Sequence, residues 1–345
     1  MASRSDTRLA AAHAARQARR HLALLAQLGD AELLGKFIRE VVARDYDGSE
    51  NAALAACAPV LGATEAGALY AEVLRRHTPQ LHAHCVDLLC RMSSGVPHEK
   101  EGAWKKSLQK IAEAIVGKLD EIGTKPREKE WLDWRQADLV PPVNAALVAD
   151  LLNVLADLHA PALRASAANA FATRPDVFDP VAVLVPALGS LRVWDTATTE
   201  LWEHSAEFLL QRSGRPPEAP RDWRQDARLS CACADCRELQ TFTADAIARE
   251  HRFRVKKERR QHLHRQIETH GLDMTHVTER VGSPQTLVCT KDRRTYQRRC
   301  DEYRKDIAAL GALAELASQA KAPAHLVQSI AAARGLAGDW SPASV

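Results

Sequence analysis

The sequence predicts a mainly α-helical protein, with a helical-repeat (α-solenoid-like) or irregular helical domain followed by a small α+β module. Aromatic residues make up only 5% of the 345-residue chain, and Ala, Leu and Arg are abundant. These abundant types lose little side-chain freedom in a helix, whereas strands favour branched and aromatic side chains. A tight cluster of cysteines in the C-terminal third predicts that the module binds a metal ion.

The helical domain is expected to span residues 1–213. Its apolar residues recur at helical spacing after Asp30, which we expect to cap a helix, and most regularly in one long stripe. That stripe consists of Trp104, Leu108, Ile111, Ile115, Leu119 and Ile122. Helices are expected to begin about every 17 to 20 residues, which gives antiparallel pairs with a period of about 35 to 40 residues, as in an α-solenoid. The pairs cannot be aligned by residue identity, so an irregular helical domain stays an alternative.

The Pro-rich segment 214–230 is expected to be a linker, because its prolines block continuation of a helix. The α+β module is expected over residues 231–320, with short helices, a strand, a β-hairpin and then a long basic helix. The hairpin is the most specific of these elements, since alternating residues in Met274–Arg280 and Thr286–Thr290 flank a turn that contains Gly and Pro. Residues 321–345 are expected to form a C-terminal helix and a loose tail.

Three cysteines, Cys231, Cys233 and Cys236, lie within six residues of one another. Thiolates and imidazoles are the ligands that Zn²⁺ prefers, usually four in a tetrahedron, so this spacing predicts a zinc site. The alternatives are cysteines that only pack or lie on the surface, and a redox pair of the Cys-x-x-Cys kind. Four protein ligands would leave no open position for water, so the zinc is expected to be structural.

The fourth ligand is expected on the helix predicted over residues 256–270. The apolar face of that helix contains Leu263 and Ile267. At about 100° per residue, His264 lies about 60° from Ile267 and His262 about 140° from it, so His264 is the expected ligand. The residues that stay open as alternatives are His251, His276, Cys289 and Cys300.

Basic residues form two groups in the same third of the chain. Between Cys231 and Lys305 there are 17 Lys and Arg against 11 Asp and Glu, or +6, so with a total of +3 the rest of the chain carries −3. Such a region can bind nucleic-acid phosphates or an acidic protein surface, whereas interleaved carboxylates favour a face that is only solvated. The residues expected to bind an acidic partner or nucleic acid are Lys256, Lys257, Arg259, Arg260, Arg293, Arg294, Arg298 and Arg299.

The sequence supports no catalytic assignment. It contains no Gly-rich phosphate-binding loop, no G-x-S-x-G or H-E-x-x-H motif, and no His-x-Asp pair of the kind that begins a non-haem iron site. No stretch reaches the roughly 18 uncharged apolar residues of a membrane span, and the N-terminal segment lacks the apolar core of a secretory signal. We therefore expect a cytoplasmic protein with no membrane partner and no catalytic residue.

Three motifs follow one another in the C-terminal third: Cys231-x-Cys233-x-x-Cys236-x-x-Leu239, then Arg260-x-His262-Leu263-His264, then the stretch from Thr278 to Lys291. Together they resemble the C-terminal region of large bacterial and fungal proteins described as 2-oxoglutarate/Fe(II) or prolyl-4-hydroxylase-like oxygenases. The segment Asp45–Asn51 is similar to the part of those proteins that precedes this region. The resemblance implies a non-catalytic module, since the oxygenase activity belongs to a jelly-roll domain whose His-x-Asp pair is absent here.

These observations predict a non-catalytic interaction or scaffold protein with a structural zinc site and a basic docking surface, whose partner is a protein. One alternative is a nucleic-acid-binding protein that uses the basic helices and the hairpin. Another is the non-catalytic part of a 2-oxoglutarate oxygenase assembly.

Overall fold

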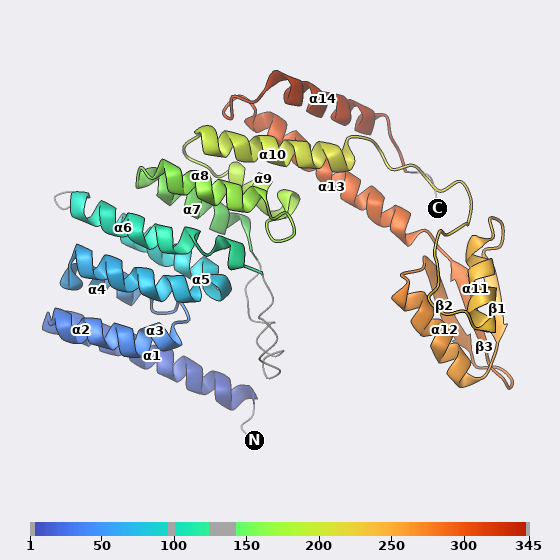
Figure 1. Ribbon diagram of the computed structural model, residues 1–345, viewed down its shortest axis with the longest axis horizontal. Coiled ribbons are helices and arrows are strands. Elements are labelled where there is room, and N and C mark those ends of the chain that lie inside the picture. Colours follow the sequence, from blue (N-terminus) through green and yellow to red (C-terminus); the bar gives the residue numbers. More distant parts are fainter. Residues whose placement is uncertain (1–3, 96–100, 124–142, 343–345) are drawn as a thin grey trace. The chain divides into compact units, whose positions relative to one another are not determined.

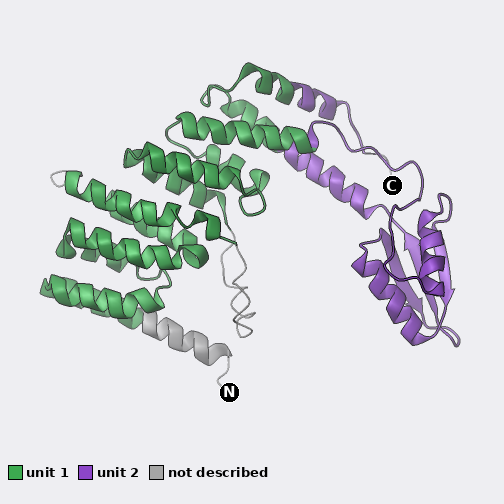
Figure 2. Ribbon diagram, in the orientation of Figure 1, with its two compact units in different colours: residues 1–212, 309–330 green, residues 213–308, 331–345 purple. Residues whose placement is uncertain are grey.

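The computed structural model describes residues 4–95, 101–123 and 143–342 and is mainly helical, as predicted (Figure 1). It divides into two compact units, which are described separately below (Figure 2). The first unit comprises residues 1–212 and 309–330, and the second comprises residues 213–308 and 331–345. Within the described ranges, no helix has the length and the apolar character that crossing a bilayer requires.

The first unit is built from helices that pack mainly against their neighbours in the sequence, as in an α-solenoid (Figure 1). Packed pairs include α4 with α5, α5 with α6, and α7 with α8. Short π-helical segments at Ile38–Val42 and Pro180–Leu184 and a 3₁₀ turn at Leu119–Glu121 interrupt or extend the α-helices. The α-helices of this part of the chain are α1 (Arg4–Leu28), α2 (Ala31–Phe37), α3 (Ala43–Asp45), α4 (Asn51–Leu61), α5 (Ala63–Ser94), α6 (Glu101–Val116), α7 (Ala145–Asp157), α8 (Pro161–Ala172), α9 (Val185–Leu188) and α10 (Thr196–Ser213).

The core of this unit follows the apolar periodicity of the sequence. All six residues of the predicted stripe from Trp104 to Ile122 are buried, although α6 ends at Val116, Leu119 begins a 3₁₀ turn and Ile122 follows that turn. The predicted N-cap Asp30 accepts a hydrogen bond from the backbone N–H of Leu33 at 3.0 Å. Burying such a stripe removes about 25 cal/mol of unfavourable hydration per Å² of apolar surface, so packing of the helices dominates the stability of this unit.

The segment before α4 is fixed to α5 by buried polar contacts. The Tyr46 hydroxyl donates to Asn51 Oδ1 at 2.7 Å, and Asn51 Nδ2 donates to the carbonyl of His84 and to Asp87 Oδ2, both at 2.8 Å. Gly48 has a positive φ of 86°, and a Cβ at this position would lie 2.3 Å from Cγ of His84. Only glycine fits both the backbone conformation and this close approach.

The second unit contains a three-stranded antiparallel sheet with strand order β1–β3–β2. Its strands are β1 (Glu250–Arg254), β2 (Met274–Glu279) and β3 (Thr286–Lys291), so the predicted hairpin is present and β1 pairs with its second strand. Helices α11 (Ala234–Ala244) and α12 (Lys257–Thr269) contribute buried side chains to the same apolar cluster as the strands. The opposite face of the sheet is more open, since the side chain of Val277 on β2 is 63% exposed.

The long helix α13 (Arg294–Leu316) begins in the second unit and contributes its residues from Ala309 onward to the first. In that C-terminal half, the carbonyl of Leu313 accepts a hydrogen bond from the indole N–H of Trp202 on α10 at 3.0 Å. The apolar continuation of this helix therefore belongs to the core of the first unit. The last helix, α14 (Ala324–Gly338), is present as expected.

The segment expected to be a linker, residues 214–230, is partly held to the second unit. The backbone N–H of Trp223 donates to Ala246 and that of Gln225 donates to Thr243, at 3.0 and 2.9 Å. The guanidinium groups of Arg249 and Arg293 also lie over the Trp223 ring, at 4.7 and 4.6 Å from its centre. These cation–π contacts give the second half of the segment a fixed place that its composition does not reveal.

Candidate metal centre

Three thiols and one imidazole meet at the N-terminal end of α11. Cys231 lies in the preceding loop, Cys233 is the N-cap residue of the helix, and Cys236 lies in its first turn. Helix α12 packs against α11 and brings His262 to the same place. The three Sγ atoms and one ring nitrogen of His262 all lie within 4.8 Å of one another.

The separations suit a tetrahedral ion. His262 Nε2 lies 3.1 Å from Cys236 Sγ and 3.7 Å from Cys233 Sγ. Around a zinc ion with Zn–S of about 2.3 Å and Zn–N of about 2.0 Å, neighbouring ligand atoms would be roughly 3.5 to 3.8 Å apart. Small rotations of these side chains would therefore place all four donor atoms around one ion. Three sulfurs and one imidazole form a donor set that can hold a metal ion, and all four positions come from the protein.

The fourth residue of the cluster is His262 and not His264, which the sequence predicted. The two histidines flank the fully buried Leu263, so each lies about 100° from the centre of the buried face, on opposite sides of α12. The prediction measured the angle from Ile267 alone, which favoured His264. The side that matters is the one facing α11, and that side carries His262.

His264 faces the sheet. Its Nδ1 lies 2.5 Å from Nδ1 of His276 on β2, and its Nε2 lies 3.4 Å from the hydroxyl of Thr278. Burial lowers the pKa of His264, and the neighbouring His276 lowers it further. The remaining candidate ligands also lie away from the three thiols: His251 pairs with Glu238 at 2.7 Å, Cys289 lies in the apolar cluster of the sheet, and Cys300 is buried on α13.

An ion pair fixes the two helices beside the cluster. Arg259, one turn before His262 on α12, donates its Nε to Oδ2 of Asp235 at 2.7 Å and a terminal nitrogen to Oδ1. Asp235 is buried in the first turn of α11, and the Arg259 guanidinium holds the pKa of its carboxyl below the usual range. The bidentate geometry sets the distance between the helices, which in turn positions His262 against the thiols.

The environments of the thiols differ. Burial, together with the neighbouring thiols, raises the pKa of Cys236 to about 12. The nearby backbone N–H of Cys236 lowers the pKa of Cys233, which is exposed. A metal ion must displace the thiol protons, so its affinity for this cluster should fall as the pH decreases.

The predicted basic residues fall into two structural classes. Arg260 is buried and donates to the carbonyl of Val255 at 2.7 Å and to Oε1 of Gln285 at 2.7 Å, so it fixes the hairpin and is not a surface residue. Arg259 is engaged by Asp235, and Arg293 stacks on Trp223. The prediction overlooked that guanidinium groups at regular spacing can also satisfy buried carbonyls and carboxylates.

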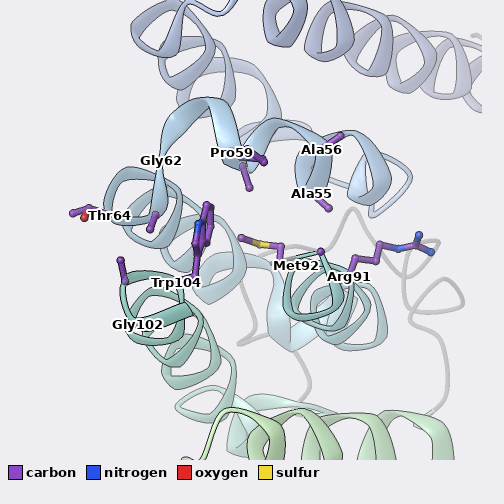
Figure 3. Close-up of a pocket in the computed structure, with 13 residues that line it drawn as sticks. Ala55, Ala56, Pro59, Gly62, Thr64, Arg91, Met92, Gly102 and Trp104 are labelled. Carbon is purple, nitrogen blue, oxygen red and sulfur yellow. The ribbon is translucent and has the colours of Figure 1, made fainter. Parts of the chain in front are cut away.

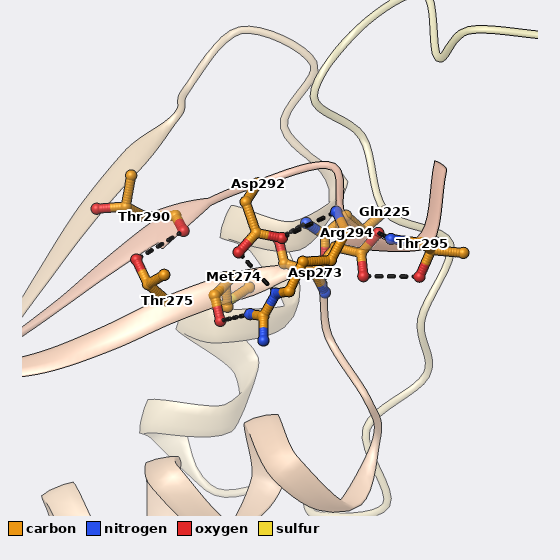
Figure 4. A network of polar contacts seen from close by, with 8 residues as sticks. All are labelled: Gln225, Asp273, Met274, Thr275, Thr290, Asp292, Arg294 and Thr295. Carbon is orange, nitrogen blue, oxygen red and sulfur yellow. Dashed lines mark hydrogen bonds and ion pairs between the residues drawn. The ribbon is translucent and has the colours of Figure 1, made fainter. Parts of the chain in front are cut away.

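Arg294 belongs to a polar network where β2, β3 and α13 meet (Figure 4). It pairs with Asp292 at 2.9 Å and donates to the carbonyl of Met274 at 2.5 Å. Asp273 accepts hydrogen bonds from the backbone N–H and the hydroxyl of Thr295 at 3.0 and 2.7 Å. This network caps the start of α13, so Arg294 has a structural role.

The remaining predicted basic residues are exposed. Arg298 lies 3.9 Å from Glu302, which is a loose ion pair one turn along α13. Arg299, Lys256 and Lys257 are exposed and form no ion pair within the described ranges. Arg254, which belongs to the same basic run of the sequence, and Arg280 are also exposed and have no carboxylate partner there. Arg280 stands apart from this run in the sequence, and the pairing of β1 and β2 with β3 brings it to the same end of the sheet as Arg254.

The first unit contains a groove of about 880 Å³ between α4 and α6 (Figure 3). Its lining consists mostly of small residues such as Ala55, Pro59 and Gly102, with the indole of Trp104 and the side chain of Met92 on one side. Arg91 is the one charged residue among the lining side chains, and it is paired with Asp87 at 2.8 Å. The groove therefore offers shape and apolar contact, but no acid and base for chemistry.

Comparison of the chain with protein families, with curated proteins and with solved structures finds no match. The resemblance of its C-terminal third to the oxygenase-associated region therefore stays a prediction. The assignment of function depends on the geometry of the chain itself.

Proposed function

We propose that this chain is a non-catalytic interaction protein whose second unit is folded around a structural Zn²⁺. The observation that carries the proposal is the convergence of Cys231, Cys233, Cys236 and His262 within 4.8 Å. Sulfur and imidazole donors favour zinc over magnesium or calcium, which prefer oxygen. Four protein donors leave no open coordination position, which supports a structural and not a catalytic ion.

Metal analysis of the purified protein tests the zinc. We expect one zinc per chain in protein purified without added metal, and the same value after extensive dialysis. The variant His262→Ala should lose most of this zinc, whereas His264→Ala, two residues away on the same helix, should keep it. A zinc content near zero in the unmodified protein would remove the basis of the proposal.

The docking surface that we propose is the basic end of the module, defined as Arg254, Lys256, Lys257 and Arg280. Arg254 ends β1 and Arg280 follows β2; Arg254 and the last residue of β2 are both paired with Thr286 of β3. Lys256 and Lys257 begin α12 directly after β1. This register, together with the start of α12 directly after β1, supports a grouping of these four exposed positive charges at one end of the sheet.

An acidic protein segment is the partner that this charge pattern favours. Arg252, Arg259, Arg294 and Arg304 are each neutralised by carboxylates of the same chain. Binding to a nucleic-acid backbone draws on many uncompensated cations, and only four are gathered at the basic end. Nucleic acid is therefore the second candidate, and the non-catalytic part of an oxygenase assembly is compatible with either partner.

A binding experiment with two probes separates these candidates. We expect a labelled glutamate-rich peptide to bind the intact protein and to lose affinity at least tenfold in the variant Lys256→Glu/Lys257→Glu. The matched control is Arg298→Glu/Arg299→Glu on α13, which should bind as the parent does. Tight binding of a single-stranded oligonucleotide with a steep salt dependence, and none of the peptide, would instead favour the nucleic-acid candidate.

A further inference from the structure

The three cysteines of the metal centre differ in how far solvent reaches them. Cys233 is exposed, Cys231 is half-buried and Cys236 is fully buried. All three are free thiols whose sulfur atoms lie within 4.8 Å of one another. A small oxidant dissolved in water therefore meets Cys233 first, with a second thiol directly behind it.

The position of Cys233 on α11 adds to this asymmetry. It is the N-cap residue, and Cys236 is in the first turn three residues later. An exposed thiol at the N-cap and a buried thiol three residues on is the arrangement by which Cys-x-x-Cys pairs exchange between dithiol and disulfide.

We propose that the metal centre is also an oxidation site, in which a hydroperoxide converts Cys233 and Cys236 to a disulfide and releases the metal. The Cys233 thiolate attacks one peroxide oxygen, the O–O bond breaks, and Cys233 sulfenic acid forms while hydroxide or alkoxide leaves. The Cys236 thiolate then attacks the Cys233 sulfur, an S–S bond forms and hydroxide leaves. Two sulfurs lose two electrons in total, the peroxide is reduced, and two protons from solvent convert the leaving groups to water or alcohol.

The metal would be lost because the disulfide leaves too few ligand atoms to hold it. A disulfide removes two of the four ligands and leaves Cys231 and His262, which do not retain Zn²⁺ tightly. Cβ atoms three residues apart on a helix are roughly 5 to 6 Å apart, so the first turn of α11 must adjust by about 1 to 2 Å for the disulfide to form. The inference rests on the proposed zinc site, whose metal it would release.

The test treats the full-length, zinc-loaded protein with a small excess of hydrogen peroxide. We expect one zinc per chain to appear on a chromogenic chelator, two thiols to be lost, and mass spectrometry to find the Cys233–Cys236 disulfide. Dithiothreitol with added zinc should restore the starting state. Retention of zinc with all thiols free would overturn the inference and leave the zinc proposal intact, and a disulfide through Cys231 would overturn the assigned pair.

Two further measurements keep the test decisive. Because Cys233→Ser removes a zinc ligand, its readout is thiol oxidation: peroxide should consume the thiols of Cys231 and Cys236 at least tenfold more slowly than in the parent, whereas Cys90→Ser on α5 should not change the rate. If Cys233→Ser does not fold, alkylation of the zinc-loaded parent with a limiting amount of iodoacetamide should label Cys233 before Cys236. Labelling of Cys236 first would contradict the inference. If the purified protein holds no zinc, the zinc proposal fails, and disulfide mapping of the oxidised protein still tests the cysteine pair.

Discussion

In the helical unit, two charged residues are buried among the described residues, Glu50 and Arg164, whereas the much smaller second unit buries Asp235, Arg260, Lys291 and Asp306. The helical unit places long apolar stripes against one another and needs few directional contacts. The second unit has one small apolar cluster, made by its sheet, α11 and α12. Its buried charges are matched by specific partners, such as the carbonyl of Asp245 for Lys291 at 2.6 Å.

This difference indicates that the two units are stabilised in different ways. A large apolar core tolerates the loss of any single polar contact, because many side chains share the burial. A small unit that buries charges depends on each partner, since an unpaired buried charge costs several kcal/mol. A metal ion held by residues of α11 and α12 would add a strong contact to such a unit.

Removal of the metal should give the largest difference in stability between the two units. Zinc binding contributes roughly 10 to 16 kcal/mol in small zinc domains, more than a unit of this size can replace by packing. We expect chelation to abolish hydrogen-exchange protection in β1–β3, α11 and α12, while α4 to α8 keep theirs. Equal loss of protection in both regions would show that the units are not independently stabilised.

Truncation of a core side chain in the helical unit should destabilise that unit and leave the second unit unchanged. Phe171 on α8 is fully buried and packs edge-on against Phe178 at 4.8 Å between ring centres. Phe171→Ala should lower the free energy of unfolding of the helical unit by about 3 to 5 kcal/mol, from lost burial and a residual cavity. Zinc content should not change, and a parallel loss of zinc would show that the stabilities of the two units are coupled.

The buried carboxyl of Glu50 gives the helical unit a pH dependence. Glu50 is 2% exposed, its Oε2 has no hydrogen-bond partner, and burial raises its pKa to about 7, with a further contribution from Asp47. Because the folded state prefers the protonated form, its stability should be highest below pH about 4.5 and decrease as the pH rises through 7.

Glu50→Gln removes this titration. At pH 8 we expect the variant to be more stable than the parent by up to about 3 kcal/mol, and at pH 4 the two should be nearly equal. Denaturant unfolding of both proteins across this pH range measures the difference. A variant that is less stable at pH 8 would show that the Glu50 charge is compensated in the folded chain.

The smallest effect should come from exposed charges. Arg298 is 71% exposed in its side chain and only loosely paired, and Arg299 is also exposed. Arg298→Glu/Arg299→Glu should change the free energy of unfolding by less than about 1 kcal/mol, in contrast to any change at the buried Arg260. A larger loss would place these arginines in contacts that hold the second unit together.

The parts of the fold that the sequence predicted are those set by local periodicity. The stripe from Trp104 to Ile122 and the hairpin of β2 and β3 both repeat with the period of their element, and both are present. The grouping of the three cysteines was also predictable, because they lie within six residues of one another in the sequence. The sequence assigned the buried Arg260 to the surface and gave no sign that the exposed Arg294 has internal partners, since no local pattern shows that Gln285 or Met274 will offer an amide or carbonyl oxygen.

The fourth residue of the metal centre shows where prediction from the sequence stopped. His262 and His264 flank Leu263 symmetrically, so helical periodicity alone cannot choose between them. The choice depends on which side of α12 faces α11, and that is set by the Asp235–Arg259 ion pair and by the packing of the sheet. Such information is tertiary and lies outside any local pattern.

The most direct test of the account is the zinc content of two matched variants, His262→Ala and His264→Ala, each purified in parallel with the parent. We expect one zinc per chain in the parent and in His264→Ala, and a strongly reduced content in His262→Ala, with the second unit unfolded only in the latter. Retention of zinc by His262→Ala together with its loss from His264→Ala would contradict the assigned centre and restore the ligand that the sequence alone predicted.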